Sequence, residues 1–160
     1  MMRISDIETF FEANVNKKSL SLVSLDNANN ISLINSENLV FDFDEVNKTI
    51  KTSDTIYFKN NKVIFVEFKN GKIKPLEFRL KATESIISFY NFIFDNNFRD
   101  NLIFPTENFK IYFVYKKTRA TIPMLYTFNS VIRDLNIEYK HLYSSLKIID
   151  DEKFIEIFEI

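Results

Sequence analysis

The stretch that decides the fold runs from residue 52 to residue 69 and reads TSDTIYFKNNKVIFVEFK. Two runs rich in β-branched and aromatic residues flank Asn60-Asn61, and asparagine tolerates the left-handed backbone of a two-residue hairpin turn. The stretch therefore predicts a β-hairpin in which Lys59 pairs with Lys62. This pairing fixes the register of every residue farther from the turn.

The predicted register places two carboxylates directly opposite each other. Asp54 faces Glu67, with their Cβ atoms roughly 5 Å apart, and like charges so placed repel. Because side chains alternate along a strand, Lys69 lies on the same face as Glu67. Hard divalent cations prefer carboxylate oxygens, and a bound cation polarises a phosphoryl oxygen and lowers the pKa of its water. The hairpin thus has the pattern of a metal site that cuts phosphodiesters, where Lys69 would stabilise negative charge on the phosphate.

The plain alternative is a strand end that emerges into water, with Glu67 and Lys69 as a solvated pair. However, residues 63–68 are apolar on both faces apart from Glu67. That pattern indicates a central, buried strand rather than an edge. A carboxylate in such a strand is costly unless it is paired, which favours the metal-site interpretation.

Composition sets the broad class of protein. The 160 residues predict a single domain, 1–160, and 46% hydrophobic with 27% charged residues is ordinary for a globular protein. The absence of cysteine excludes disulfides and zinc–thiolate sites, and we expect a cytoplasmic location. No run of 18 apolar residues occurs, so no membrane association is expected.

Charge is distributed unevenly along the chain. The net charge of −1 excludes a basic nucleic-acid binder of the ordinary kind, but residues 48–81 carry nine basic and three acidic residues. This basic window surrounds the carboxylate pair and could hold a polyanion against it. A solvated face in a lysine-rich sequence is the alternative. The basic residues are Lys48, Lys51, Lys59, Lys62, Lys69, Lys72, Lys74, Arg79 and Lys81.

The remaining pattern predicts helices on either side of the strands. A capping box at Ser5–Glu8 predicts a helix over about 6–17, and Pro75 opens a helix to residue 96 with an apolar stripe. Asp42 and Asp44 are expected on the solvent side of an alternating strand. The apolar stripe comprises Leu76, Leu80, Ile87, Tyr90 and Phe94. Strands are expected at 19–25, 31–34, 39–46 and 109–115. A helix is expected at 123–136, and either a helix or a strand at 153–160.

This order, with Ser53-Asp54 opening one strand and Val66-Glu67-Phe68-Lys69 in the next, resembles the PD-(D/E)XK nuclease superfamily over roughly residues 5–138. The resemblance implies an α/β, restriction-endonuclease-like core in the order αβββαβ, with a central mixed β-sheet flanked by helices. Ser53 stands where the family motif has proline.

The resemblance also implies a function. Asp54 and Glu67 would ligate Mg²⁺ or Mn²⁺, Lys69 would orient or activate the attacking water, and an acid of the first helix, Glu8 or Glu12, would join them. The substrate would be nucleic acid, DNA rather than RNA, and a homodimer stays open as the oligomeric state. The alternative is a non-catalytic protein of the same fold that acts as a binding or assembly module. The basic residues expected to hold the substrate are Lys72, Lys74, Arg79 and Lys81, of which Arg79 or Lys81 would enter the site.

Overall fold

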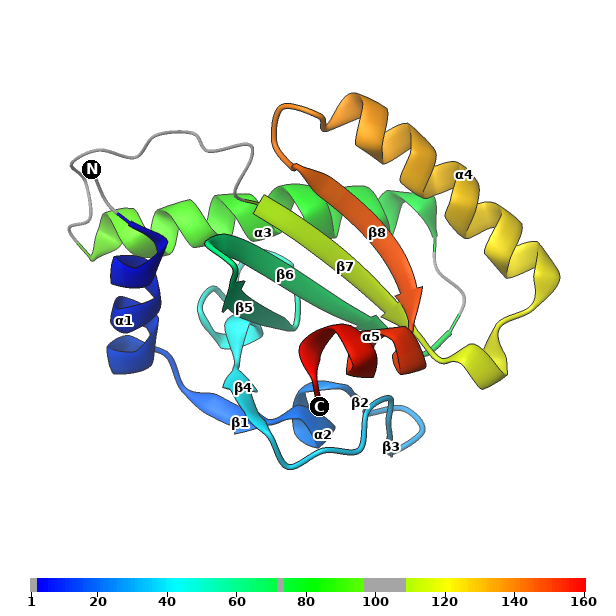
Figure 1. Cartoon of the computed structure of the whole chain (residues 1–160), viewed down its shortest axis with the longest axis horizontal. Coiled ribbons are helices and arrows are strands. Elements are labelled where there is room, and N and C mark those ends of the chain that lie inside the picture. Colours follow the sequence, from blue (N-terminus) through cyan, green and yellow to red (C-terminus); the bar gives the residue numbers. More distant parts are fainter. Residues whose placement is uncertain (1–2, 72–73, 97–108) are drawn as a thin grey trace.

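The computed structural model describes residues 3–71, 74–96 and 109–160. At its centre lies a four-stranded mixed sheet in the order β5–β6–β7–β8 (Figure 1). β5 is antiparallel to β6, whereas β6, β7 and β8 are parallel to one another. The described residues thus form a mixed α/β protein. The four strands are β5 (Thr55–Lys59), β6 (Lys62–Lys69), β7 (Phe109–Tyr115) and β8 (Ser145–Asp150).

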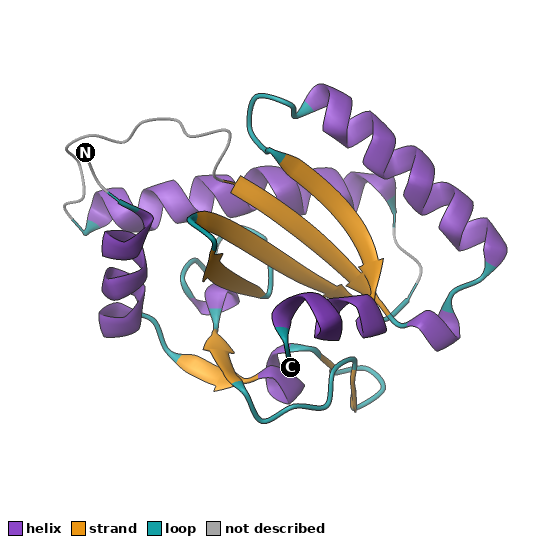
Figure 2. Ribbon diagram, in the orientation of Figure 1, coloured by secondary structure: helices purple, strands orange, loops and turns teal. Residues whose placement is uncertain are grey.

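Helices lie on both faces of this sheet (Figure 2). Figure 1 shows α3 behind the sheet and α5 in front of it. Both parallel connections contain a helix, as parallel strands require. No helix in the described parts of the chain is long and apolar enough to cross a lipid bilayer. The five helices are α1 (Ile4–Asn14), α2 (Leu20–Val23), α3 (Pro75–Asp95), α4 (Ile122–Glu138) and α5 (Asp151–Phe158).

The predicted hairpin and its register are confirmed. Asn60 and Asn61 have φ values of 53° and 55°, as a tight two-residue turn requires. Lys59 pairs with Lys62, and the ladder runs outward to its last pair, Thr55 and Val66. Asp54 directly precedes this ladder, at the end of the hairpin farthest from the turn.

Alternation along β6 divides the hydrophobic core into two clusters. Val63 and Phe65 pack in the cluster that includes Phe78 of α3. Ile64 and Val66 pack on the opposite face in the cluster that includes Phe154 of α5. Glu67 follows Phe65 by two residues, so its side chain is directed to the α3 face.

The predicted apolar stripe of α3 is wrong. Leu76 is 64% exposed, whereas the side chains that face the sheet include the fully buried Phe78 and Ala82. The helix carries apolar residues on two faces, so periodicity alone does not select one. The inward face combines aromatic rings with small side chains such as Ser85, which let the helix approach the strands closely.

The N-terminal strand predictions are largely wrong. The 19–25 segment is mainly the one-turn helix α2, because the Ser19 hydroxyl accepts a hydrogen bond from the Leu22 N–H and caps it. The predicted 39–46 strand is only β4 (Leu39–Phe41), followed by a 3₁₀ turn, η1 (Phe43–Glu45). β4 pairs with β1 (Lys17–Ser19), and the 31–34 strand is reduced to β3 (Ile31–Ser32), paired with β2 (Leu25–Asp26).

Smaller differences occur elsewhere. α1 begins at Ile4, where the Asp6 carboxylate accepts a hydrogen bond from the Arg3 N–H, rather than at the predicted Ser5–Glu8 box. Asp42, expected in solvent, is 5% exposed and forms an ion pair with Lys18. Strand β8 was not predicted, and the ambiguous C-terminal segment is the helix α5.

Candidate metal centre

The hairpin brings Asp54, Glu67 and Lys69 together at the carboxyl end of β6. Glu67 is 3% exposed, and its Oε1 lies 2.8 Å from Lys69 Nζ. Asp54 Oδ2 accepts a hydrogen bond of 2.7 Å from the Phe68 N–H. That bond ties Asp54 to β6 across the hairpin, so the register holds the two acids near each other.

Lys81 of α3 enters the same centre from the side. Its Nζ lies 3.1 Å from Glu67 Oε2 and donates a hydrogen bond to the Thr52 carbonyl. Glu77, four residues before Lys81 on α3, lies instead 3.7 Å from Lys69 Nζ. Two ammonium groups therefore flank one buried carboxylate, although Glu67 Oε2 lacks a hydrogen bond of good geometry within the described structure.

The two carboxylates affect each other electrostatically. Burial and the neighbouring charge of Glu67 raise the pKa of Asp54 well above its ordinary value. Burial alone would lower the pKa of the Lys69 ammonium, but Glu67, Asp54 and Glu77 together raise it. Lys69 thus stays charged at neutral pH, while Asp54 is an acid that another nearby cation would stabilise in its charged form.

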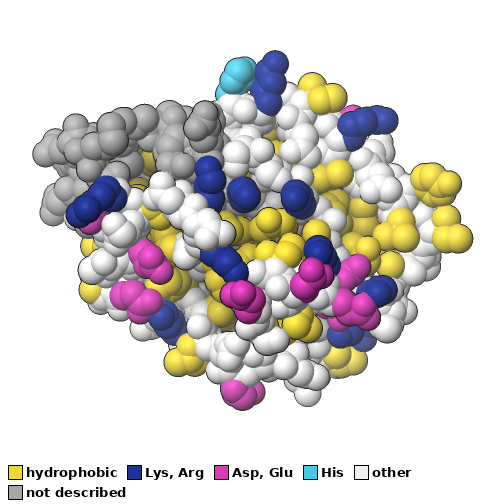
Figure 3. Space-filling model, viewed as in Figure 1, with side chains coloured by type: hydrophobic (Ala, Val, Ile, Leu, Met, Phe, Trp, Pro, Cys, Tyr) yellow, Lys and Arg dark blue, Asp and Glu magenta, His cyan; other side chains and the backbone are white. Residues whose placement is uncertain are grey.

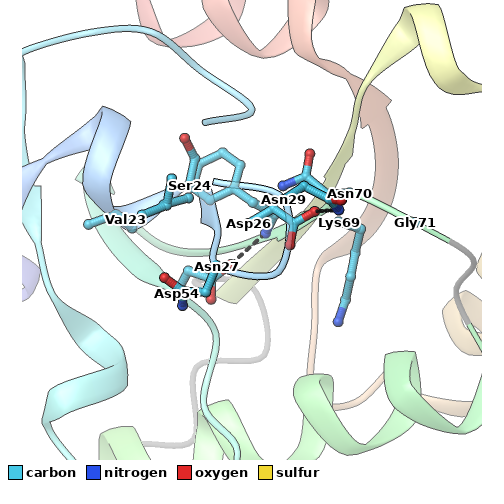
Figure 4. A pocket seen from close by; sticks show the side chains of 11 residues that line it. Val23, Ser24, Asp26, Asn27, Asn29, Asp54, Lys69, Asn70 and Gly71 are labelled. Carbon is cyan, nitrogen blue, oxygen red and sulfur yellow. Dashed lines mark hydrogen bonds between the residues drawn. The ribbon is translucent and has the colours of Figure 1, made fainter. Parts of the chain in front are cut away.

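Asp54 and Lys69 line a cleft of about 410 Å³ that opens to solvent (Figure 4). The β2–β3 turn forms its other wall with Asp26, Asn27 and Asn29. Asp26 accepts hydrogen bonds from the Ala28 N–H and the Asn29 amide, which holds the turn in shape. The sequence alone does not place this turn at the site, because nothing local relates it to a hairpin some 30 residues later.

The structure does not bring the acids of α1 to this centre. Glu8 lines a separate small pocket with Lys17 and residues 56–58, and Glu12 is hydrogen-bonded to Lys17 at 2.7 Å. Within the described residues, no group of three or more His, Asp or Glu side chains is arranged to hold a metal. Of the metal ligands predicted from the sequence, only Asp54 and Glu67 lie at this centre.

The predicted substrate-binding residues have diverse settings. Lys74 is exposed and directly precedes α3, whereas Arg79 forms a two-pronged ion pair with Glu138 of α4. Lys81 is turned inward to Glu67, as described above, and so belongs to the centre itself. Lys72 lies outside the described residues.

The donor set nevertheless fits a small divalent cation. Magnesium is commonly held by one or two carboxylates, with water and substrate phosphate supplying the other oxygens, so a third acid is not required. Asp54 and Glu67 supply two such carboxylates beside an open cleft, and the buried Glu67 Oε2 is held by the Lys81 ion pair without a hydrogen bond of good geometry. A cation there would offset the repulsion that raises the pKa of Asp54.

A row of Lys and Arg side chains crosses the α5 face of the molecule (Figure 3). Lys110 precedes Tyr112 by two residues and Lys147 pairs with it, and Tyr112 packs on this face. Lys62 is likewise two residues before Ile64 of the same cluster. The sheet therefore carries basic charge on the face opposite α3, outside the basic window of the sequence except for Lys62.

Comparison with known proteins gave no significant match, whether to family models, to curated proteins or to solved structures.

Proposed function

We propose that the protein is a Mg²⁺- or Mn²⁺-dependent nuclease of a single, restriction-endonuclease-like domain that hydrolyses phosphodiesters, DNA rather than RNA. One observation carries the proposal: the hairpin register brings Asp54, Glu67 and Lys69 together at the edge of an open cleft. Carboxylates that can bind a hard cation, with a charged lysine beside them, are what phosphodiester hydrolysis requires.

The arrangement of elements supports the proposed fold. With the short elements β1, α2, β2 and β3 between α1 and β4 set aside, α1, β4, β5, β6, α3 and β7 follow the order αβββαβ. They include an antiparallel hairpin followed by a helical crossover to a parallel strand. β4 packs beside β5 through Phe41 and Phe58, whose ring centroids are 6.0 Å apart. It differs from a regular third strand because it hydrogen-bonds to β1 rather than to β5.

Each residue of the centre has a distinct task in this proposal. Asp54 and Glu67 would hold the cation. A bound cation would polarise a phosphoryl oxygen of the substrate and lower the pKa of its bound water. The Phe68 N–H orients Asp54, and Lys81 holds Glu67 from the α3 side. Because its pKa is raised, Lys69 acts as a positive charge that stabilises the phosphate and orients water, not as a base.

The decisive experiment is cleavage of linear, single-stranded and branched DNA, and of RNA, with Mg²⁺ or Mn²⁺. Lys69→Ala should abolish turnover while largely sparing metal binding, and Glu67→Ala should abolish both. Lys140→Ala removes an exposed lysine that lies after α4 and serves as the matched control. If no substrate is cut, or if cleavage persists in both site variants, the proposal is wrong.

A second function, a non-catalytic nucleic-acid-binding or assembly module, is favoured by one observation. Both oxygens of Glu67 already lie within ion-pair distance of lysines, so the carboxylate is neutralised without metal. Titration of Mg²⁺ or Mn²⁺ into wild type and Glu67→Ala separates the two functions. A module of this kind would show no metal binding that depends on Glu67.

A further inference from the structure

A second hollow adjoins the cleft of the metal centre. Its volume is about 140 Å³, and it shares Lys69, Asn70 and Gly71 with that cleft. Its other wall is formed by the end of β7, by the segment after it and by Met124 in the first turn of α4. The residues 69–71 thus separate two hollows at the same edge of the sheet.

The lining of this second hollow is basic. Lys116 and Arg119 join Lys69 there, and no carboxylate lines it among the described residues. The short 3₁₀ helix η3 (Lys117–Arg119) follows Lys116, and the Arg119 N–H donates to the Lys116 carbonyl at 3.0 Å. This turn brings both residues to the lining of the same hollow.

The two cations differ in their freedom to bind a ligand. Lys116 Nζ lies 2.6 Å from Asp151 Oδ2 and 3.1 Å from the Leu33 carbonyl, so it is fixed in place. The Arg119 side chain is exposed, and its guanidinium makes no hydrogen bond or ion pair within the described residues. Its charge acts on Asp26 across the cleft, but the Asp26 oxygens are already engaged by Ala28 and Asn29.

From this geometry we infer that Lys116 and Arg119 form a phosphate-binding subsite for the nucleic-acid strand whose scissile phosphate lies at Asp54 and Glu67. The exposed guanidinium of Arg119 would bind phosphate with its planar fork of donors. Lys116, whose charge is already paired with Asp151, would border the subsite as a second, fixed donor. The inference rests on the proposed function for the identity of the strand, since it places a neighbouring phosphate of that strand in the second hollow.

The spacing of the ligand fits this arrangement. A nucleic-acid strand carries one phosphate for every 3.4 Å or so of helical rise, so the phosphates beside the scissile one come within reach of an adjacent hollow. The subsite would therefore favour a polyanionic strand over a lone nucleotide. Arg119 is thus a positioning residue: it would hold the strand and not touch the reacting atoms.

The test is equilibrium binding of fluorescent single-stranded DNA and RNA oligonucleotides to the full chain in EDTA, over a range of salt concentrations. At about 50 mM salt, Arg119→Gln should weaken binding by about tenfold and lower the salt slope by about 0.7, the value for one phosphate contact on a single strand. Arg119→Lys should recover part of the affinity, because it keeps the charge but not the fork.

Arg133→Gln is the matched control, since Arg133 is an exposed arginine of α4 that lines neither hollow. Equal effects of Arg119→Gln and Arg133→Gln, or no binding by wild type, would overturn the subsite. A cleavage assay separates the two proposals. If the protein cuts nucleic acid but its binding does not depend on Arg119, the nuclease proposal stands and the subsite proposal is wrong. If it binds nucleic acid through Arg119 but never cuts, the subsite proposal stands and the nuclease proposal is wrong.

Discussion

Two clusters, each built around a buried carboxylate and its partners, lie at the carboxyl edge of the sheet, and they differ in how completely their charges are paired. Asp151, at the start of α5, is 7% exposed; its Oδ2 lies 2.6 Å from Lys116 Nζ and its Oδ1 accepts from the Lys117 N–H. Burial opposes ionisation there, but these partners prevail and lower the pKa of Asp151. In the other cluster, burial and Glu67 raise the pKa of Asp54.

The difference indicates which cluster is suited to bind something else. Asp151 has one lysine and one backbone donor of its own, so it is a closed structural contact that holds α5 against the end of β7. Asp54 and Glu67 are two acids in one site, with Asp54 at the wall of an open cleft. A group whose charged form is unfavourable in the free protein gains most from a cation, which makes this cluster the functional candidate.

The sharpest way to break this comparison is to neutralise one carboxylate in each cluster. Glu67→Gln should lower turnover by about 100-fold or more, because the site loses a charged ligand of its metal. Asp151→Asn should keep most of its turnover at saturating substrate. The measurement is kcat for nucleic-acid cleavage. Equal losses of kcat in the two variants would show that the distinction between a functional cluster and a structural cluster is wrong.

Metal binding should stabilise only one cluster. At Mn²⁺ one hundred times its Kd, linkage adds about 2.7 kcal/mol to the free energy of unfolding, or roughly 5–10 °C in Tm. Asp54→Asn should blunt this rise, whereas Asp151→Asn should retain it. Thermal melts with and without Mn²⁺ measure both. An identical rise in Asp54→Asn would point to non-specific ion effects.

Removal of the structural charge should cost stability. Asp151→Asn leaves Lys116 without its partner and should lower the free energy of unfolding by about 2 kcal/mol in metal-free buffer. Asp134→Asn, which removes an exposed acid paired with Arg133, should cost about 0.5 kcal/mol or less. Denaturant unfolding measures both values. A loss at Asp151 no larger than at Asp134 would contradict the assignment of Asp151 as a structural contact.

The smallest expected effect is the pH dependence of that cost. Because the folded pKa of Asp151 is lowered, its contribution is fully present above the ordinary aspartate pKa of about 4 and is lost as pH falls through the folded value. The stability difference between wild type and Asp151→Asn should therefore shrink below about pH 4. A difference that grows as the pH is lowered would show that the sign of the shift is wrong.

Local patterns predicted some elements and misled at others. The Asn60-Asn61 turn and the alternation of residues 62–69 determine a hairpin by themselves, because turn geometry and side-chain period act over a few residues. At Ser19–Val23 the same alternation was misread, since Ser19 caps a helical turn there. Asp42 was likewise expected in solvent, but Lys18 neutralises it in the interior.

The sequence by itself determined the hairpin, its register and therefore the convergence of Asp54, Glu67 and Lys69. Only the tertiary structure decided what surrounds them: the choice of Lys81 over Arg79 to reach Glu67 from α3, the β2–β3 turn across the cleft, and the second hollow that Lys116 and Arg119 line. It also placed Glu8 and Glu12 elsewhere. The physical reason is the sequence separation over which the interactions act. The register of the hairpin follows from residues that are neighbours in the sequence. The packing of α1, α3 and the β2–β3 turn depends instead on burying apolar faces, which several arrangements could satisfy.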